Sequence, residues 1–228
     1  MNYLEMVGHL HQLCGVSGPA PATVLGQTGE RARLVGWIRR AWDMIQAQSP
    51  AWLWMQAEFS FQAVVGQRNY SLVEAGILSR FRRWDVESFR CFLTSTGVPD
   101  EQFLVHWDYP ILRDTYLLGS QSTNQSRPVV FAIEPQSRSI VLADIPDQAY
   151  TVRGRYFKGA QTLVADADIP EMPDDYHWAI IYRAMMMYAN YESAGDVMAE
   201  GVSGYRPLMV QLSGDQLPAV NCGSEAWA

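Results

Sequence analysis

The sequence predicts an α+β protein, a helical bundle built from both chain ends with an antiparallel β-rich part inserted in it. Apolar residues recur at helical spacing near both ends of the chain and alternate with polar residues in its middle. The apolar stripe after Pro173 needs a partner, and the amphipathic helix after Thr28 can supply one by packing ridges into grooves. We therefore expect a discontinuous helical domain (residues 1–52 and 170–217), an inserted β-rich domain (residues 53–169) and a C-terminal tail (residues 218–228).

Two amphipathic helices open the chain. Residues 2–14 have helical apolar spacing, and Asn2 can cap their first turn. Gly15 and the glycine- and proline-containing segment after it end this helix. The second helix spans residues 28–48, with Thr28 as its expected cap and a Ser-Pro pair as its stop. Its apolar stripe consists of Leu34, Ile38, Ala41, Trp42 and Ile45.

The middle of the chain has the alternation that is typical of strands. Residues 59–64 alternate, a turn follows at residues 66–69, and residues 70–72 return, which predicts a hairpin. Residues 81–93 alternate over a longer stretch and predict a further strand.

Short helices and short strands follow. Residues 100–118 suit one or two short helices, because Pro110 divides the helical pattern, and residues 119–126 read as a polar loop. Three short segments with tight turns between them then predict an antiparallel meander over residues 128–133, 139–143 and 149–157.

Two further helices follow Pro173. Asp174 and Asp175 suit the start of the first, where carboxylates meet free N–H groups, and Gly195 is its expected stop. The second covers residues 194–212, where Pro207 and two glycines favour a kink. The stripe of the first helix consists of Trp178, Ile181, Tyr182, Met185, Tyr188 and Ala189.

The composition indicates a folded, acidic protein rich in aromatic side chains. The 228 residues are 48% hydrophobic and 12% aromatic, which fits a large core or a large interface. A net charge of −7 argues against a dedicated binder of phosphate backbones, which needs a basic patch. Three widely spaced cysteines give no disulfide or zinc pattern and favour a reducing compartment. Residues 1–15 suit an amphipathic helix better than a signal peptide, and no apolar run is long enough to span a membrane.

The histidines form no convincing catalytic or metal site. His9 and His11 are two residues apart on a helix, so they point in different directions and cannot share a metal as an i, i+4 pair would. His106 and Asp108 look like a fragment of a general-base arrangement, but such groups are normally brought together by the fold. We therefore interpret these side chains as ordinary helix or loop residues.

Residues 166–175 are rich in acidic side chains. Asp166 and Asp168 could begin a calcium loop, but the residues after them do not continue that pattern, so a solvated loop and helix start is the better interpretation. We expect no catalytic residue, no metal site and no cofactor. In the Met185–Met187 run, Met187 is a candidate for contact with a partner, because methionine repacks readily.

Segments spread over most of the chain carry a family resemblance. They comprise residues 3–7, 14–18, 28–38, 41–46, 52–54, 66–70, 150–156, 169–173, 176–181 and 189–192. They include Gly-Gln-Arg-Asn-Tyr, Tyr-Thr-Val-Arg-Gly-Arg-Tyr and Ile-Pro-Glu-Met-Pro. In these segments the chain resembles the head-to-tail adaptor (connector) proteins of tailed bacteriophages.

The resemblance implies a structural protein of the virion neck, made in the cytoplasm of the bacterial host, and not an enzyme. Adaptors of this kind form a ring beneath the portal, usually a dodecamer, with the helical part against neighbouring subunits and the portal. A C-terminal extension docks into the portal, and the β part receives tail nozzle or fibre proteins. DNA passes through the lumen during ejection, with no membrane partner. An acidic lumen would let DNA slide, because it offers few cations to phosphates.

Two sets of contact residues follow as expectations. Leu217, Val220 and Trp227 are the candidates for portal binding. Arg39, Arg40 and Met187 are the candidates for contact between subunits, and we assign the arginines to ion pairs between subunits before DNA. The alternatives are another tail or head-completion protein of a phage neck, or an enzyme with an acidic metal-dependent site.

Overall fold

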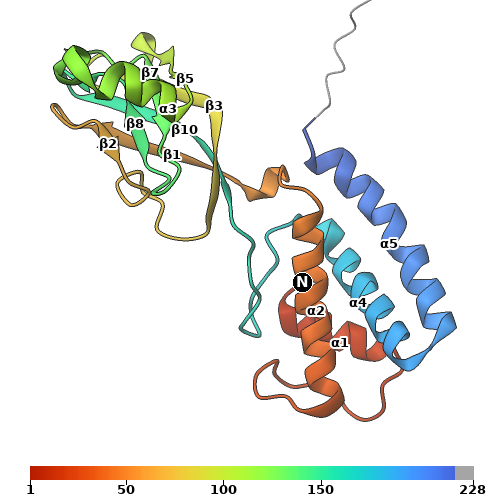
Figure 1. Cartoon of the computed structure of the whole chain (residues 1–228). Helices are drawn as coiled ribbons and strands as arrows, with labels where there is room; N and C mark the ends of the chain where they lie inside the picture. Colours follow the sequence, from red (N-terminus) through yellow and green to blue (C-terminus); the bar gives the residue numbers. More distant parts are fainter. Residues whose placement is uncertain (219–228) are drawn as a thin grey trace, which may run out of the picture. The chain divides into compact units, whose positions relative to one another are not determined.

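The computed structural model describes residues 1–218, which form two compact units. One unit contains Met1–Met55 together with the chain from Ala160 onward, and the other contains Gln56–Gly159. We call them the helical unit and the β unit (Figure 1). The first holds the long helices and the second holds the strands, so the predicted mixed α+β class is confirmed.

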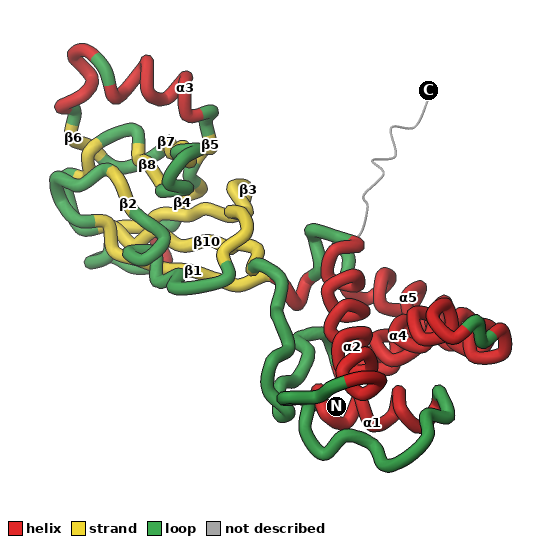
Figure 2. The backbone as a smooth tube through the Cα atoms, turned by 60° about the horizontal axis from the view of Figure 1, so that its bottom comes forward, coloured by secondary structure: helices red, strands yellow, loops and turns green. Residues whose placement is uncertain are grey.

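The helical unit contains four long helices around one hydrophobic core. Trp42, Trp52 and Tyr3 are almost completely buried in it, and the Trp52 indole donates to the Ile45 carbonyl over 3.1 Å. Figure 2 shows the helices together in red. Their bounds are α1 (Tyr3–Leu13), α2 (Gly29–Gln48), α4 (His177–Glu192) and α5 (Gly195–Gln216), with short 3₁₀ turns η1 (Leu53–Met55) and η5 (Asp174–Tyr176).

The helix ends show which capping predictions are right. The Asn2 side chain accepts from the Glu5 N–H over 2.8 Å, and Glu5 accepts from the Asn2 N–H over 2.9 Å, so this capping box confirms Asn2 as the cap of α1. Thr28 is the N-cap residue of α2, but its side chain makes no capping hydrogen bond. Gly195 as a stop is wrong: α4 ends at Glu192 because Ser193 adopts a left-handed conformation, and Gly195 begins α5.

Two glycines let α5 approach α4 closely. A Cβ added at Gly204 would lie 2.6 Å from the Tyr182 ring, and one at Gly201 would lie 3.0 Å from Met186 Cγ. Pro207 lies inside α5, on its exposed side. The glycines that weaken the helical pattern in the sequence are therefore required by the packing of α5 on α4.

The β unit contains two four-stranded sheets and a two-stranded ladder. The first sheet has the order β1-β10-β3-β4, all antiparallel, and the second has the order β2-β8-β7-β5 with β5 parallel to β7. Parallel β6 and β9 form the ladder. The bounds are β1 (Gln56–Ala63), β2 (Asn69–Tyr70), β3 (Phe81–Leu93), β4 (Gln102–Phe103), β5 (Val105–His106), β6 (Gln125–Ser126), β7 (Val130–Ile133), β8 (Ile140–Leu142), β9 (Ile145–Pro146) and β10 (Tyr150–Lys158).

The predicted hairpin and meander are wrong in their pairing. β1 pairs with β10 over eight residues, which places Phe59 opposite Gly154, whereas β2 is only two residues long and pairs with β8. β7 and β8 do pair, but β10 belongs to the other sheet, where it lies between β1 and β3 and pairs antiparallel with both. The strand predicted at residues 81–93 is confirmed as β3.

Short helices lie between β5 and β6. They are α3 (Tyr109–Leu112), a π-helical turn η3 (Arg113–Leu117) and a 3₁₀ turn η4 (Gly119–Thr123), so the loop predicted at residues 119–126 is partly helical. Pro110 does not divide this region but lies in the first turn of α3, where its fixed φ suits a helix start. The core of the unit centres on Phe89 of β3, stacked on Phe131 of β7 with ring centroids 4.2 Å apart.

Candidate interaction surfaces

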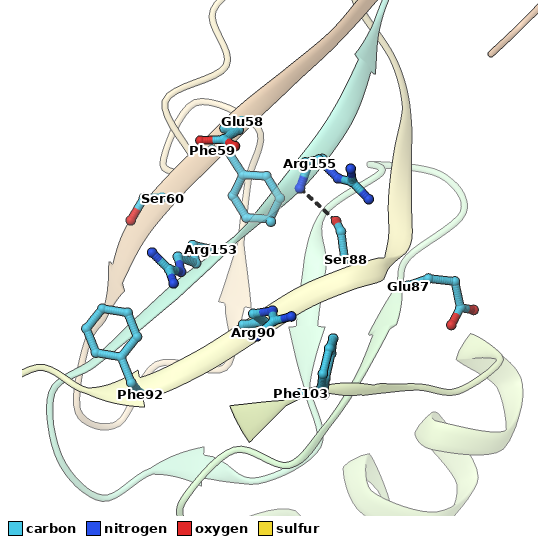
Figure 3. Close-up of a pocket in the computed structure, with 11 residues that line it drawn as sticks. Glu58, Phe59, Ser60, Glu87, Ser88, Arg90, Phe92, Phe103, Arg153 and Arg155 are labelled. Carbon is cyan, nitrogen blue, oxygen red and sulfur yellow. Dashed lines mark hydrogen bonds between the residues drawn. The ribbon is translucent and has the colours of Figure 1, made fainter. Parts of the chain in front are cut away.

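The outward face of the first sheet carries a hollow of about 860 Å³. Side chains alternate across a sheet, so Glu58 and Ser60 of β1 point outward while Phe59 points to the core. Figure 3 shows the lining side chains on the sheet. The hollow is lined by Glu58, Phe59, Ser60, Glu87, Ser88, Arg90, Phe92, Phe103, Arg153, Gly154 and Arg155.

Carboxylates of the same unit hold the arginines of the hollow. Glu101, with a side chain 9% exposed, accepts from Arg153 Nε over 2.5 Å and from Arg90 Nη1 over 3.2 Å. The hydrogen bond from Arg153 is the main cause that lowers the pKa of Glu101. Arg155 pairs with Asp85 over 3.0 Å. The charges of this hollow are therefore largely satisfied within the chain.

Aromatic rings complete the hollow. The Arg90 guanidinium lies 4.0 Å from the centroid of the Phe103 ring, and Phe103 is 59% exposed. The Ser88 hydroxyl donates to the Asp85 carbonyl over 2.6 Å and accepts from the Arg155 N–H over 2.7 Å, so it is not poised as a nucleophile. The chemistry that this arrangement offers is binding through stacked cations and exposed rings.

The residues considered for catalysis take ordinary structural roles. His9 lies against Trp178 with ring centroids 5.0 Å apart, and His11 is buried in the helical core. The His106 ring lies 5.3 Å from that of Phe131. Across residues 1–218 no group of three or more His, Cys, Asp or Glu could hold a metal ion. None of the helices in this part of the chain is long and apolar enough to cross a membrane.

The acidic loop is held by hydrogen bonds within itself and to residues 23 and 24. Asp166 accepts from the Val24 N–H over 2.6 Å and from the Thr23 hydroxyl over 3.1 Å. Asp168 accepts from the N–H groups of Val164 and Ala165, which hold the pKa of this carboxyl below its usual value. Both carboxylates therefore fix loops of the helical unit, which is the interpretation the sequence favours.

The proposed subunit-contact residues belong to the helical unit, whereas the hollow belongs to the β unit. Arg39 donates through Nε to the Leu163 carbonyl over 2.9 Å, so part of its hydrogen-bonding capacity is used within the chain. Arg40 is exposed and makes no ion pair with any residue up to 218. Met187 is half-buried against the helical core. Their role between subunits stays a prediction.

An aromatic cluster on α2 and α4 was not anticipated from the sequence. Trp37 contacts Tyr188 and Tyr191, each with ring centroids 5.8 Å apart, and the Arg33 guanidinium lies 4.4 Å from the Tyr191 centroid. Tyr191 is 52% exposed. The sequence signal for this cluster is the spacing within two pairs. Arg33 and Trp37 are four residues apart on α2, and Tyr188 and Tyr191 are three apart on α4, so each pair lies on one helix face.

The candidates for portal binding lie at the end of the described chain. Leu217 packs half-buried against the helical core, and its N–H donates to the Ser213 carbonyl over 3.2 Å. Val220 and Trp227 lie outside the described residues. Portal binding by these three residues stays a prediction.

The chain matches a model of a known protein family. The model of the family described as SU10 adaptor protein matches residues 1–211, which include almost all of both units. A search of curated proteins found no match.

Proposed function

The chain belongs to the SU10 adaptor family of phage head-to-tail adaptors, and from this membership we propose that it forms a ring joining the portal to the tail. The family makes the chain a structural adaptor of the phage neck and confirms the resemblance seen in the sequence. The proposal adds a dodecameric ring whose lumen is part of the DNA channel. We also propose that the chain is made in the host cytoplasm and has no enzymatic role.

The observation that carries the proposal is the length of the family match. Residues 1–211 cover α1 through most of α5 and the whole β unit, so both units belong to the adaptor. We propose that the helical unit is the bundle built from both chain ends, with the β unit as the domain inserted in it. A net charge of −7 supports a lumen through which DNA slides.

The helical unit is the proposed contact with the portal and with neighbouring subunits. Leu217, Val220 and Trp227 are assigned to the portal, and Arg39, Arg40 and Met187 to the contact between subunits. Support comes from the charge of Arg40, which stays exposed and unpaired within residues 1–218.

The β unit is the proposed contact with tail nozzle or fibre proteins. Its hollow offers the exposed ring of Phe103 beside the Arg90 guanidinium, and aromatic and arginine side chains are enriched at protein interfaces. Another tail or head-completion role on the same scaffold is the alternative, and the position of the gene relative to portal and terminase genes distinguishes the two.

Mixing the purified chain with purified portal rings of the same phage tests the proposal. We expect a monomer or weak oligomer alone, and complete adaptor rings on the portal, visible by negative-stain electron microscopy. A chain lacking residues 218–228 should not dock. If the full-length chain does not bind portal at any ratio, the proposed position in the neck is wrong. If the truncated chain docks as well as the full-length chain, only the assignment of the tail to portal binding is wrong.

A further inference from the structure

The two outer helices of the helical unit carry opposite net charge. α4 lies between α2 and α5 (Figure 1). The α2 sequence has four arginines and two acidic residues, whereas the α5 sequence has three acidic residues and one arginine. Because α2 and α5 flank α4, their outward faces are two different surfaces of the same unit.

Contacts with α4 show that α2 and α5 run in the same direction. Along α2, Trp37 contacts Tyr188, and Met44 accepts from Arg183 over 3.7 Å, so α2 is antiparallel to α4. Along α5, Gly201 lies against Met186, and the Tyr205 ring lies 5.7 Å from the same Arg183. α5 is therefore also antiparallel to α4. Arg40 of α2 then lies within about one helical turn, ~5 Å, of the level of Ser203 on α5.

Exposed residues at matching levels are complementary in charge and size. On α2 the outward residues recur at spacings of three and four, which keeps them on one face. The α5 face repeats the same spacing. Within this one-turn range, the register that sets Arg40 level with Ser203 places Arg33, Gly36, Arg40, Asp43 and Ala47 opposite Asp196, Ala199, Ser203, Arg206 and Val210. Opposite charges meet at two levels, Arg33 with Asp196 and Asp43 with Arg206, and between them Gly36 meets Ala199 and Arg40 meets Ser203.

These charged groups form no salt bridge with any residue from 1 to 218. Arg33, Arg40, Asp196 and Arg206 are exposed and form no salt bridge with any residue in the described part of the chain. Val210 is 74% exposed on the same face of α5. The Arg33 guanidinium does lie 4.4 Å from the centroid of the Tyr191 ring. Charges without a salt bridge, in a complementary order around an exposed aliphatic side chain, fit a protein surface that is covered by a partner.

We propose that the outward face of α2 packs, in parallel, on the outward face of α5 of a second copy of this chain. The inference rests on the proposed ring and assigns the residues of its subunit contact. Two different faces make a heterologous contact, which closes into a ring when each copy is rotated about one axis. Rotation about an axis parallel to these helices changes neither the direction of a helix nor the height of a residue along the axis. Residues of α2 and α5 that lie at the same height within one chain therefore also lie at the same height in neighbouring copies.

Gly36 supports the same contact. A Cβ at this position would meet no atom of the described residues within 4 Å, and Gly36 does not have a positive φ, so no contact within residues 1–218 requires glycine. Glycine weakens a helix relative to alanine. Facing Ala199 of a neighbour, it would allow the two helices to approach closely.

Disulfide trapping tests the register. The chain with Cys222→Ser, Ala47→Cys and Val210→Cys should give, on mild oxidation with portal, a head-to-tail ladder of dimers, trimers and larger species. The matched control carries Ala47→Cys with Ala199→Cys, which lies 11 residues, or about 16 Å, out of register, keeps both charge pairs and should give no ladder. Either cysteine alone should give none.

The outcomes separate this inference from the proposed function. Rings on the portal without the ladder, or a ladder of equal yield from the out-of-register pair, would overturn the α2–α5 contact and leave the adaptor role standing. Dimers from Val210→Cys alone would indicate an isologous contact and also overturn it. If the chain forms no rings with portal, the proposed function fails, and a ladder that persists would still support the contact.

Discussion

The charged side chains of the two units differ in whether they have ion partners within residues 1–218. In the β unit, arginines of the hollow are held by carboxylates of the same unit, with Glu101 bridging Arg90 and Arg153. In the helical unit, Arg40 and Asp196 stay exposed without an ion partner among residues 1–218. Charges satisfied within the chain fix a surface, whereas unpaired charges in complementary order are available to a second copy. This difference leads us to assign subunit contacts to the helices.

The largest expected effect comes from the core of the β unit. Phe89→Ala removes a fully buried ring stacked on Phe131, so we expect a loss of about 3–5 kcal/mol in the free energy of unfolding. Urea titration measures it, and hydrogen exchange should show lost protection in residues 56–159 with the helices retained. The control is Phe103→Ala, whose ring is 59% exposed and should cost less than about 1 kcal/mol. Equal losses for the two variants would contradict this view of the core.

The second largest expected effect is on ring assembly and comes from a charge on the helical unit. Arg33→Glu places a like charge opposite Asp196 of the neighbour, so we expect ring assembly on the portal to weaken by about tenfold, ~1.4 kcal/mol. Adding Asp196→Arg to the same chain restores opposite charges and should restore assembly. Mass photometry with portal measures both variants. Failure of the double variant to recover, with unchanged melting of the monomer, would contradict the pairing of Arg33 with Asp196.

The helices were predictable from the sequence because their signals are local. The capping box of Asn2 and Glu5 lies within four residues, and the stripe of α2 is visible in its own spacing. Strand pairing is not local. The partner of Phe59 is Gly154, nearly a hundred residues later, where its ring lies against the backbone of a residue without a side chain. No feature of residues 59–64 specifies that partner.

The interaction surfaces, like the strand pairing, depend on contacts between residues that are far apart in the sequence. The spacing of Arg153 and Arg155 places both on one strand face, so part of the hollow was open to prediction. Glu101, which joins Arg90 to Arg153, lies just before the edge strand β4 and has no sequence signal. Arg39 likewise reaches the Leu163 carbonyl, a contact that only the fold creates. Residue type and spacing predict a surface, but not which charges the fold neutralises.

A third effect tests the fixed charges of the hollow. Glu101→Gln removes the anion between two arginines, and we expect a loss of about 1–2 kcal/mol in the free energy of unfolding. Chemical denaturation at pH 7 measures it. The control is Glu87→Gln, an exposed acid of the same hollow without an ion pair within residues 1–218, which should change stability by less than about 0.5 kcal/mol.

The effect of Glu101 should also depend on pH. Its pKa in the folded chain lies below the ordinary value of 4.5, so ionised Glu101 stabilises the fold above that pH. The difference between Glu101→Gln and the unmodified chain should then shrink as the pH falls below 4.5 and through the lower folded pKa. A difference that stays constant down to complete protonation would show that the carboxylate charge does not hold the arginines.

The smallest expected effect comes from substitutions at Gly36, which distinguish the stability of the monomer from the assembly of the ring. Gly36→Ala places a methyl group where no atom lies within 4 Å, so it should raise the free energy of unfolding of the monomer by up to about 1 kcal/mol. Gly204→Ala, the same change in α5, puts its Cβ 2.6 Å from the Tyr182 ring and should lower it. Gly36→Gln should keep the monomer as stable while weakening assembly, because the longer side chain holds α5 of the neighbour away. Thermal melting and mass photometry with portal measure the two quantities independently. Full assembly by Gly36→Gln would mean that the outward face of α2 stays exposed in the ring, and the unpaired charges of the helical unit would then require a partner other than a second copy.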